Sequence, residues 1–351
     1  MVLEILEGSE KRKKIMTGGK LTMDLFNNSI LNTEKLNTQK KFENTKEVLH
    51  IGFGIDSRFA LGMGVLMNSI ILNNPRQNIA FHVFTDGIVK SDIKRLKMLA
   101  QKEYVEITIY YVNIEVFLNF PTSAGWPHAT YYRFIMGEKL YGITDKMLYL
   151  DADVLCIGSL RELIETDMGN NIILGIDDYM TDFAARAEKL SIRHGRYFNA
   201  GVMYIDVNRW HDEKIAARAI KMIMEDPQKY QFLDQDILNV LLDGKTRYVD
   251  RKWDHIYNMS FMNHTLPENT VLIHYTGDKP WQRWTEHHFM VNRYYEYIQK
   301  SPWSDVALTE PVHYKELSKM ARSFKKRGMY LQYLKYYYEY LVVRTKTKLN
   351  I

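Results

Sequence analysis

Two acidic residues one position apart form the clearest candidate site in this sequence. Asp151 and Asp153 follow the apolar run at 147–150, which is typical of a short buried strand. A carboxylate beside buried apolar residues is costly unless another group compensates its charge. A divalent cation would do so, because Mg²⁺ and Mn²⁺ prefer oxygen ligands and often connect protein carboxylates to phosphates. Acids also cap helices and form turns, so the pair alone leaves both interpretations open.

Other polar residues follow predicted strands, which is where open α/β sheets bind their ligands. These residues are Asp56, Asp86, Asp177, Asp178 and His274. A lone histidine after an apolar strand is more often a hydrogen-bonded structural residue. His274, however, precedes Gly277 and Lys279, a loop that could bring backbone and one positive charge close to an anion. Two carboxylates, one imidazole and phosphate oxygens would make a reasonable set of ligands for Mn²⁺.

Two short polar motifs complete the candidates. Asn-Ala-Gly at 199–201 precedes an apolar strand, and Asp-Gln-Asp at 234–236 opens a predicted helix. Ordinary turn chemistry would explain the first motif, and an N-cap role for Asp234 would explain part of the second. Both motifs also offer side chains that could hydrogen-bond a ligand.

The elements that must position these residues indicate an α/β fold. Apolar runs predict strands at 48–55, 79–85, 105–112, 147–150, 172–176, 202–207 and 246–249. Helical patterns predict helices at 60–73, 90–102, 130–140, 160–166, 211–225 and 234–243. Strand and helix alternate through the first three strands, which is typical of a parallel sheet with right-handed crossovers.

Composition places the chain among globular proteins. The 351 residues suit one large domain or one domain with an appendage, and 46% apolar residues suffice for a substantial core. No apolar run is long enough for a transmembrane helix, and the N-terminus has the wrong charge order for a secretory signal peptide. Cys156 is the only cysteine, so no intrachain disulfide can form. These features favour the cytoplasm, and residues 1–47 read as a polar, partly disordered leader.

The C-terminal region is basic and aromatic. Between 315 and 351 only Glu316 and Glu339 oppose a large excess of positive charge. The basic residues there are Lys315, Lys319, Arg322, Lys325, Lys326, Arg327, Lys335, Arg344, Lys346 and Lys348. Two rows share helical spacing, one of Leu331, Leu334, Tyr338 and Leu341 and one of Tyr330, Tyr333, Tyr337 and Tyr340.

Two interpretations of these rows remain open. The helix could pack its apolar face on the main domain. Alternatively it could lie at a membrane surface, with its tyrosines at headgroup depth and its basic residues on anionic lipid. Nucleic acid is not expected as a partner, because a helical row of tyrosines suits a membrane interface better than splayed bases.

Six motifs in sequence order resemble the family 8 retaining glycosyltransferases. They are Phe53-Gly-Ile-Asp56, Tyr131-Tyr-Arg133, Leu150-Asp-Ala-Asp153, Phe198-Asn-Ala-Gly201, Asp234-Gln-Asp236 and His274-Tyr-Thr-Gly277. The family includes glycogenin and bacterial lipooligosaccharide and lipopolysaccharide core transferases. The segments 79–86, 144–151 and 301–304 and the basic extension are most similar to the lipopolysaccharide core group.

The resemblance implies a fold and a reaction. The fold would be GT-A (Rossmann-like), a mixed, mostly parallel sheet flanked by helices over residues 48–305. Residues 306–351 would form a helical, membrane-associating extension. The enzyme would move glucose or galactose from a UDP-hexose donor to the lipopolysaccharide outer core, forming an α linkage. It would act as a peripheral protein on the inner face of the bacterial inner membrane, and removing residues 315–351 would release it while UDP-hexose hydrolysis persists.

The resemblance also implies roles for individual residues. The expected ligands of Mn²⁺ or Mg²⁺ are Asp151, Asp153 and His274. The residues expected to contact the nucleotide and diphosphate are Gly54, Ile55, Asp56, Phe59, Ala152, Gly277 and Lys279. The residues expected to hold the donor sugar are Arg133, Asp177, Asn199, Ala200 and Asp234. Gln235 would lie near the β face of the anomeric carbon.

Two positions depart from the family pattern. Phe59 stands where related enzymes often have a tyrosine stacked on uracil, and the loop from Gly277 to Lys279 is one residue shorter than usual. No carboxylate nucleophile is evident, which favours attack of the acceptor on the face that UDP leaves. The alternatives are a glycogenin-like transferase with a soluble acceptor, a non-catalytic membrane-associated module and a nucleotidyltransferase. Oligomeric state and the choice between glucose and galactose are left open.

Overall fold

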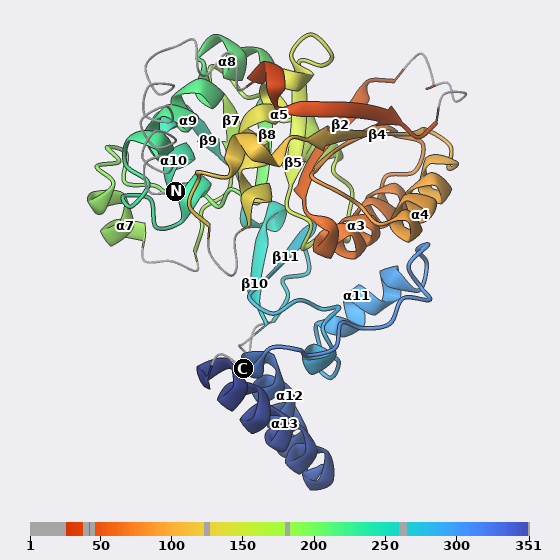
Figure 1. Ribbon diagram of the computed structural model, residues 1–351. Coiled ribbons are helices and arrows are strands. Elements are labelled where there is room, and N and C mark those ends of the chain that lie inside the picture. The colour runs from red at the N-terminus through yellow and green to blue at the C-terminus, as the bar shows by residue number, and fades with distance from the viewer. Residues whose placement is uncertain are drawn as a thin grey trace, which may run out of the picture.

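The computed structural model describes residues 26–37, 42, 46–122, 127–179, 183–259 and 265–349. Most of the expected polar leader, at 1–25, 38–41 and 43–45, lies outside the described residues. Within the described part, a main sheet with flanking helices forms the body, and a helical pair at the C-terminus extends from it (Figure 1).

The main sheet has eight strands in the order β1-β4-β3-β2-β5-β8-β7-β9. Their bounds are β1 Ile30–Lys35, β2 Val48–Ile55, β3 Asn78–Thr85, β4 Val105–Val112, β5 Lys146–Leu150, β7 Ile173–Gly175, β8 Val202–Asp206 and β9 Thr246–Tyr248. β2, β3, β4 and β5 pair in parallel, as do β7 and β9, whereas β1 and β8 run antiparallel to their neighbours. The prediction of a mixed, mostly parallel α/β sheet is confirmed.

Helices cover both faces of this sheet, and further helices follow towards the C-terminus (Figure 1). Their bounds are α3 Ala60–Asn73, α4 Lys90–Ala100, α5 Tyr132–Leu140, α6 Arg161–Ile164, α7 Phe183–Lys189, α8 Val207–Asp212, α9 Ile215–Glu225, α10 Leu233–Leu241, α11 Val291–Ile298, α12 Tyr314–Lys326 and α13 Tyr330–Leu349. Short 3-10 helices are η1 Ser57–Phe59, η2 Ile114–Phe117, η3 His128–Tyr131, η4 Arg251–Trp253 and η5 Arg283–Thr285.

The alternation of side chains along β5 separates two hydrophobic cores. Leu148 and Leu150 pack into the core beneath α3 and α4, whereas Met147 and Tyr149 pack into the core beneath α5, α8, α9 and α10. Because successive residues of a strand point to opposite faces, a strand buried on both sides must be apolar throughout. β5 therefore ends between two layers, and the residues that follow it emerge at the carboxyl edge of the sheet.

A second, three-stranded sheet lies against this edge. It has the order β10-β11-β6, with β10 at His255–Asn258, β11 at Leu272–Thr276 and β6 at Val154–Cys156. β6 begins directly after Asp153 and pairs with β11, placing Val154 opposite His274. His274 was predicted to follow a strand; it lies inside β11, and this pairing is what brings it beside the acidic turn.

Three further features of the body also differ from the predictions. β1 belongs to the segment expected to be a leader; its side chains are mostly exposed at the sheet edge, so it has no apolar periodicity to detect. The predicted helix at 211–225 is two helices, separated at Lys214, which has a left-handed φ of 54°. The N-cap of α10 is Phe232 and not Asp234, whose carboxylate contacts Thr130 and Arg133 instead.

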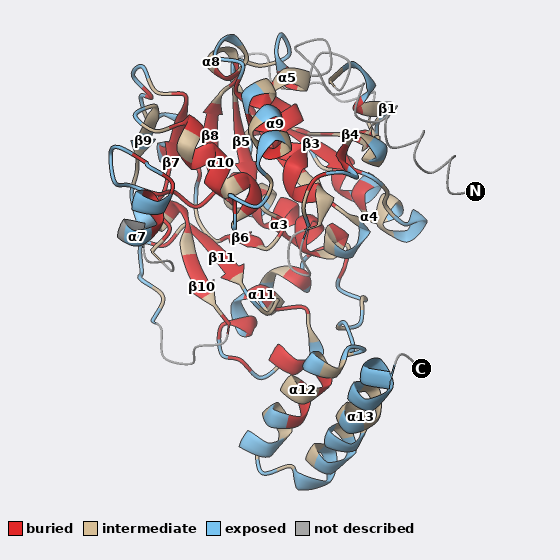
Figure 2. Ribbon diagram, turned by 60° about the vertical axis from the view of Figure 1, so that its left-hand side comes forward, coloured by how far each residue is buried: buried red, intermediate tan, exposed pale blue. Residues whose placement is uncertain are grey.

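The C-terminal hairpin, defined here as α12 and α13, projects from the body (Figure 1). α12 buries Leu317, Met320 and Ala321, whereas α13 buries no residue (Figure 2). The helices contact each other through pairs such as Phe324 and Tyr336, whose rings stack 5.3 Å apart. The predicted apolar row is exposed, by 82% at Leu331, 58% at Leu334, 69% at Tyr338 and 42% at Leu341. The interpretation that this row packs on the main domain is therefore wrong.

Candidate active site

The acidic turn after β5 is held by buried partners on both sides. Asp151 takes part in the sheet edge through its N–H, which donates to the carbonyl of Gly201 at 2.8 Å. Its carboxylate accepts from the Tyr149 hydroxyl at 2.7 Å and from the Arg133 guanidinium at 3.0 Å. Both side-chain donors bond to the same carboxylate oxygen, Oδ1. They therefore fix the direction in which the second oxygen, Oδ2, points.

Asp153 lies between two cationic side chains. Its carboxylate contacts Lys279 Nζ at 2.5 Å and His274 Nε2 at 3.3 Å. The other ring nitrogen of His274 lies 3.1 Å from Asp254, whose side chain is fully buried. Burial alone would lower the pKa of His274, but the acids on either side raise it well above its ordinary value. Burial would raise the pKa of Asp153, and Lys279 and His274 reverse this effect and lower it.

The ligand set fits a divalent cation. Ligand atoms of Asp151, Asp153 and His274 all lie within 4.8 Å of one another. A Cβ on Gly201 would meet His274 Cε1 at 2.4 Å and Asp151 Oδ2 at 2.8 Å, so only glycine leaves this space free. Asp254 supports the imidazole from behind, an arrangement that fixes the orientation of metal-binding histidines. Two carboxylate oxygens and one imidazole nitrogen suit Mn²⁺ or Mg²⁺.

A buried arginine connects the acidic turn to α10. Arg133, on α5, donates to the carbonyl of Ala200 at 2.5 Å, and its Nε lies 3.0 Å from Asp234. The Asp234 carboxylate also accepts from the Thr130 hydroxyl at 2.5 Å. Burial raises the pKa of Asp234 to about 6, although Arg133 and Thr130 oppose the effect. The network places two sequence-predicted sugar contacts, Arg133 and Asp234, in one ion pair.

Gln235 is held beside the Asn-Ala-Gly turn. Its carbonyl oxygen accepts from the Ala200 N–H at 3.0 Å, and its amide nitrogen donates to Asp178 at 2.9 Å. Asn199 also points at Asp178, at 3.4 Å. The neighbouring Asp177 instead pairs with Arg196 at 2.6 Å. The structure therefore joins Asp178 to Gln235 and Asn199, and it does not bring the expected Asp177 into this group.

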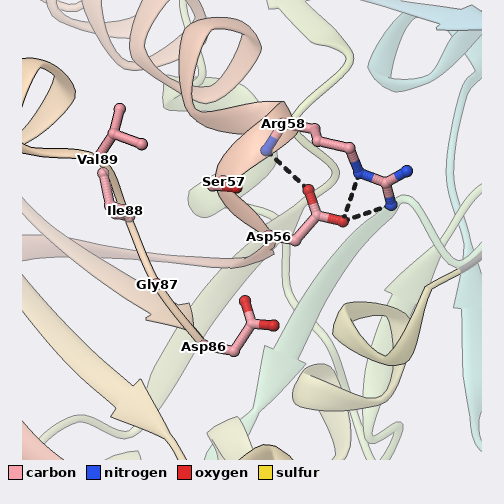
Figure 3. A pocket seen from close by; sticks show the side chains of 7 residues that line it. All are labelled: Asp56, Ser57, Arg58, Asp86, Gly87, Ile88 and Val89. Carbon is pink, nitrogen blue, oxygen red and sulfur yellow. Dashed lines mark hydrogen bonds and ion pairs between the residues drawn. The ribbon is translucent and has the colours of Figure 1, made fainter.

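A cleft of about 490 Å³ opens beyond the ends of β2 and β3 (Figure 3). Asp56 and Asp86, which follow these two strands, both line it, and Arg58 pairs with Asp56 at 2.7 Å. Burial raises the pKa of Asp86. Asp56 and Asp86 thus lie together beside an open cleft at the carboxyl ends of their strands.

Four other residues expected near the nucleotide, at positions 54, 55, 59 and 152, make packing contacts in the structure. Ile55 is buried, and a Cβ on Gly54 would lie 3.0 Å from the carbonyl of Ala129, so Gly54 lets η3 approach β2. Phe59 packs edge-on against Trp281, with ring centres 6.0 Å apart. The carbonyl of Ala152 lies under α3, where it would meet a Cβ on Gly62 at 2.6 Å.

The shorter loop after β11 still reaches the acidic turn. Gly277 has a left-handed φ of 73°, which a glycine adopts without strain. Lys279 Nζ contacts Asp153 and also donates to the carbonyl of Tyr275 at 2.9 Å. The loss of one residue relative to the family pattern therefore leaves the lysine within the site.

Several residues of the site escaped the sequence analysis. They are Thr130, Tyr149, Gly201 and Asp254; Asp178 was named only as one of the acids that follow a predicted strand. Tyr149 and Gly201 lie within recognised motifs, but their contacts with Asp151 depend on the register between β5 and β8. Thr130 is separated from Asp234 by 104 residues, and Asp254 from His274 by 20, so no local pattern predicts either contact.

Comparison with protein families gives two matches. The model of Glycosyl transferase family 8 matches residues 50–285, and that of the Glycosyl transferase family 8 C-terminal region matches residues 290–344. The chain is 34% identical over 305 residues to a lipopolysaccharide 1,3-galactosyltransferase of Salmonella typhimurium, covering 83% of this chain and 90% of that protein. It is 33% identical over 276 residues to a lipopolysaccharide 1,2-glucosyltransferase of Escherichia coli K12, covering 75% and 81%.

Solved structures show the same architecture. The galactosyltransferase LgtC, crystallised with donor and acceptor sugar analogues, is 29% identical and superposes with a TM-score of 0.63. The match covers 72% of this chain and 96% of that one. The fold of residues around the acidic turn is thus the GT-A arrangement that the motifs implied.

Proposed function

Because the chain belongs to glycosyl transferase family 8, we propose that it transfers glucose or galactose from a UDP-hexose to the lipopolysaccharide outer core. The new linkage would be α, formed with retention. The observation that carries this proposal is the assembly of Asp151, Asp153 and His274 with Lys279 at the carboxyl edge of the main sheet, the edge at which the cleft lined by Asp56 and Asp86 also lies. Sites for phosphate esters combine such acids with a cation in this way.

The donor diphosphate would lie between the acidic turn and the loop after β11. Asp151, Asp153 and His274 would hold Mn²⁺ or Mg²⁺, which when bound neutralises the charge that develops on the departing UDP. Lys279 would leave Asp153 and contact the diphosphate, adding a second positive charge at the same place. Asp56 would accept the uracil N–H, and Phe59 would contact the base.

The donor sugar would lie over the Asn-Ala-Gly turn. Asp234, paired with Arg133, would accept its hydroxyls, and Asn199 would add an amide. The hydrogen bonds of Asp178 support it, in place of Asp177, as the second acid facing the sugar. Gln235 would lie beneath the anomeric carbon. LgtC also has a glutamine in its active site, and one of its solved structures carries glutamate in place of that glutamine.

The reaction would proceed by attack on the face that UDP leaves. The bond from the anomeric carbon to UDP oxygen breaks, and a bond to the acceptor oxygen forms on the same face. The acceptor proton passes to the departing phosphate oxygen, so no protein base is needed. A neutral amide such as that of Gln235 is a poor nucleophile, which supports this route over a covalent intermediate.

The C-terminal hairpin would bind the membrane that carries the acceptor. Within the described part of the chain, no helix is long and apolar enough to cross a bilayer. The exposed row of α13 together with the basic residues around it suits an anionic lipid surface. We place the enzyme as a peripheral protein on the inner face of the bacterial inner membrane.

The test is release of UDP from UDP-glucose and from UDP-galactose, with truncated lipopolysaccharide acceptors and with Mn²⁺ or EDTA. Metal-dependent, acceptor-dependent release with one of the two sugars is expected, and anomeric coupling in the product should show the α linkage. Equal transfer to a soluble glucan would favour a glycogenin-like enzyme. Absence of release with both sugars would reject the proposal.

A further inference from the structure

The loop that carries Lys279 is fixed on its C-terminal side by its own neighbours. The N–H of Lys279 donates to the Gln282 side chain at 2.7 Å. The Thr285 hydroxyl donates to the carbonyl of Lys279 at 2.8 Å. These bonds hold the chain from Lys279 to η5, but they leave the rotation about Gly277 and Asp278 to be fixed by something else.

The first helix of the C-terminal hairpin supplies that contact. Lys319, on α12, donates to the carboxylate of Asp278 at 2.5 Å across 41 residues of sequence. The Asp278 side chain is only 15% exposed and that of Lys319 is 41% exposed, so the pair is partly shielded from water. α12 also packs against η5, and the Arg283 N–H donates to the carbonyl of Thr309 at 3.0 Å. The polypeptide leading into α12 and α12 itself therefore both brace this loop.

Asp278 and Lys279 are adjacent and point to different partners. Asp278 is held by α12, and Lys279 reaches in the other direction to Asp153. Glycine at 277 has no side chain to restrict the loop, and its left-handed φ marks the place where the chain turns. Releasing Asp278 from Lys319 would let the loop rotate there, and Lys279 Nζ would move away from the acidic turn.

We infer that Lys319 is a positioning residue for the donor site, acting through Asp278 to aim Lys279 at the diphosphate. The inference rests on the proposed function, because it takes Lys279 as a diphosphate contact. It also divides the extension: α12 supports the donor site, and only α13 is free to serve as a membrane surface. Removal of residues 315–351 should therefore impair UDP-hexose hydrolysis, contrary to the sequence-based expectation. Removal of α13 alone, by ending the chain before Tyr330, should leave hydrolysis intact.

The test compares Lys319→Met and Asp278→Asn with the intact wild-type protein. We expect KM for UDP-hexose, and the dissociation constant of UDP measured by calorimetry with Mn²⁺, to rise about three- to tenfold in both variants. The value of kcat at saturating donor should stay within about twofold of the wild-type value. In these variants Lys279 would occupy its position less often, and this weakens donor binding before it slows the chemical step. Lys319→Arg should restore most of the lost affinity.

The control is Lys326→Met, which removes the same charge from the exposed far end of α12. In this variant the KM for UDP-hexose and the dissociation constant of UDP should both stay unchanged. The control therefore distinguishes a general loss of attraction for an anionic ligand from a loss of loop position. The double variant Asp278→Lys with Lys319→Asp restores an ion pair between the two positions and should recover part of the affinity. Such recovery would show that the loss in a single variant is not caused by poor folding. Wild-type values in Lys319→Met and Asp278→Asn would overturn the inference while leaving transfer by the wild type intact. Failure of the proposed function would instead appear as no transfer by the wild type itself.

Discussion

The donor site and the α13 surface are built in opposite ways. Around the acidic turn the charged groups are buried or largely shielded from water, and most have more than one partner. Arg133, for example, contacts Thr130, Ala200, Asp151 and Asp234, and its side chain is 5% exposed. On α13 no residue is buried, and Leu331 is 82% exposed.

The difference teaches which part of the molecule is complete without a partner. Buried charges are tolerated only where other charges and hydrogen bonds compensate them, so the donor site must be organised by the fold before ligand arrives. An exposed apolar row gains nothing from the fold and becomes favourable only when another surface covers it. Small substitutions in the donor site should therefore lower activity. The α13 surface should respond only to substitutions that change its polarity or charge.

The largest expected effect comes from breaking the acidic turn. Asp153→Asn removes one ligand charge and the partner of both Lys279 and His274. Transfer should fall at least about 100-fold, because one charged metal ligand is lost and His274 and Lys279 lose their shared carboxylate partner. Steady-state UDP release at saturating donor measures this, with the exposed Asp212→Asn as a control that should behave as wild type. Retention of a tenth or more of the wild-type rate would contradict the assigned role.

A single methyl group should be nearly as damaging at the right place. Gly201→Ala would put a Cβ within 2.4 Å of His274 and 2.8 Å of Asp151, so both side chains must move. Affinity for Mn²⁺ should fall about 10- to 100-fold while the protein remains folded. Calorimetric titration with Mn²⁺ tests this. Gly158→Ala, whose Cβ would have three atoms of Val271 as its nearest contacts at 3.4 to 3.6 Å, should leave the affinity unchanged.

The surface of α13 should respond in a different assay. Leu331→Glu with Leu334→Glu should lower binding to anionic lipid vesicles at least about tenfold, because two apolar contacts are replaced by repelled charges. UDP-hexose hydrolysis without vesicles should stay within about twofold of wild type. Vesicle sedimentation measures the binding, and Gln332→Glu, which adds a charge without removing an apolar side chain, is the matched control. Unchanged sedimentation of the double variant would remove the membrane role of α13.

The smallest expected effect is a pH dependence of stability from Asp234. Burial raises its pKa to about 6 from an ordinary 3.8, so between these values the folded protein binds more protons at this site than the unfolded chain. The contribution of Asp234 to the free energy of unfolding therefore falls as pH rises through this window, by about 1 kcal/mol per pH unit. Urea unfolding of wild type and Asp234→Asn at pH 4.5 and 5.5 isolates this contribution as a difference. An equal change in both proteins would show that Asp234 has no raised pKa.

The same contrast explains how far the sequence could predict the structure. The body strands were predictable because burial on both faces makes them continuous apolar runs, as at β3 and β5, and their ends give Asp151 and Asp153. β1 was missed because an edge strand with exposed side chains carries no such run. Asp178 contacts Gln235, whereas Asp177 contacts Arg196, and two adjacent aspartates in the sequence give no hint of which one faces α10.

Contacts between distant segments were the least predictable part. Arg133 was expected to hold the sugar, but its ion pair with Asp234 joins α5 to α10 and required the folded arrangement. The same is true of Lys319 and Asp278, which look in the sequence like ordinary solvated charges. The sequence could suggest that the apolar row of α13 is exposed. It could not decide between exposure of this row and its packing on the body.

The most direct test of the donor site is binding of Mn²⁺ followed by electron paramagnetic resonance, with and without UDP. The free-ion signal should fall as wild-type protein is added and fall further when UDP is present, because the nucleotide diphosphate and the Asp151–Asp153–His274 cluster share the ion. Asp153→Asn should lose most of this binding, and Asp212→Asn should keep it. Equal Mn²⁺ binding by wild type and Asp153→Asn, or no gain from UDP, would contradict a metal-dependent UDP-hexose site at this turn.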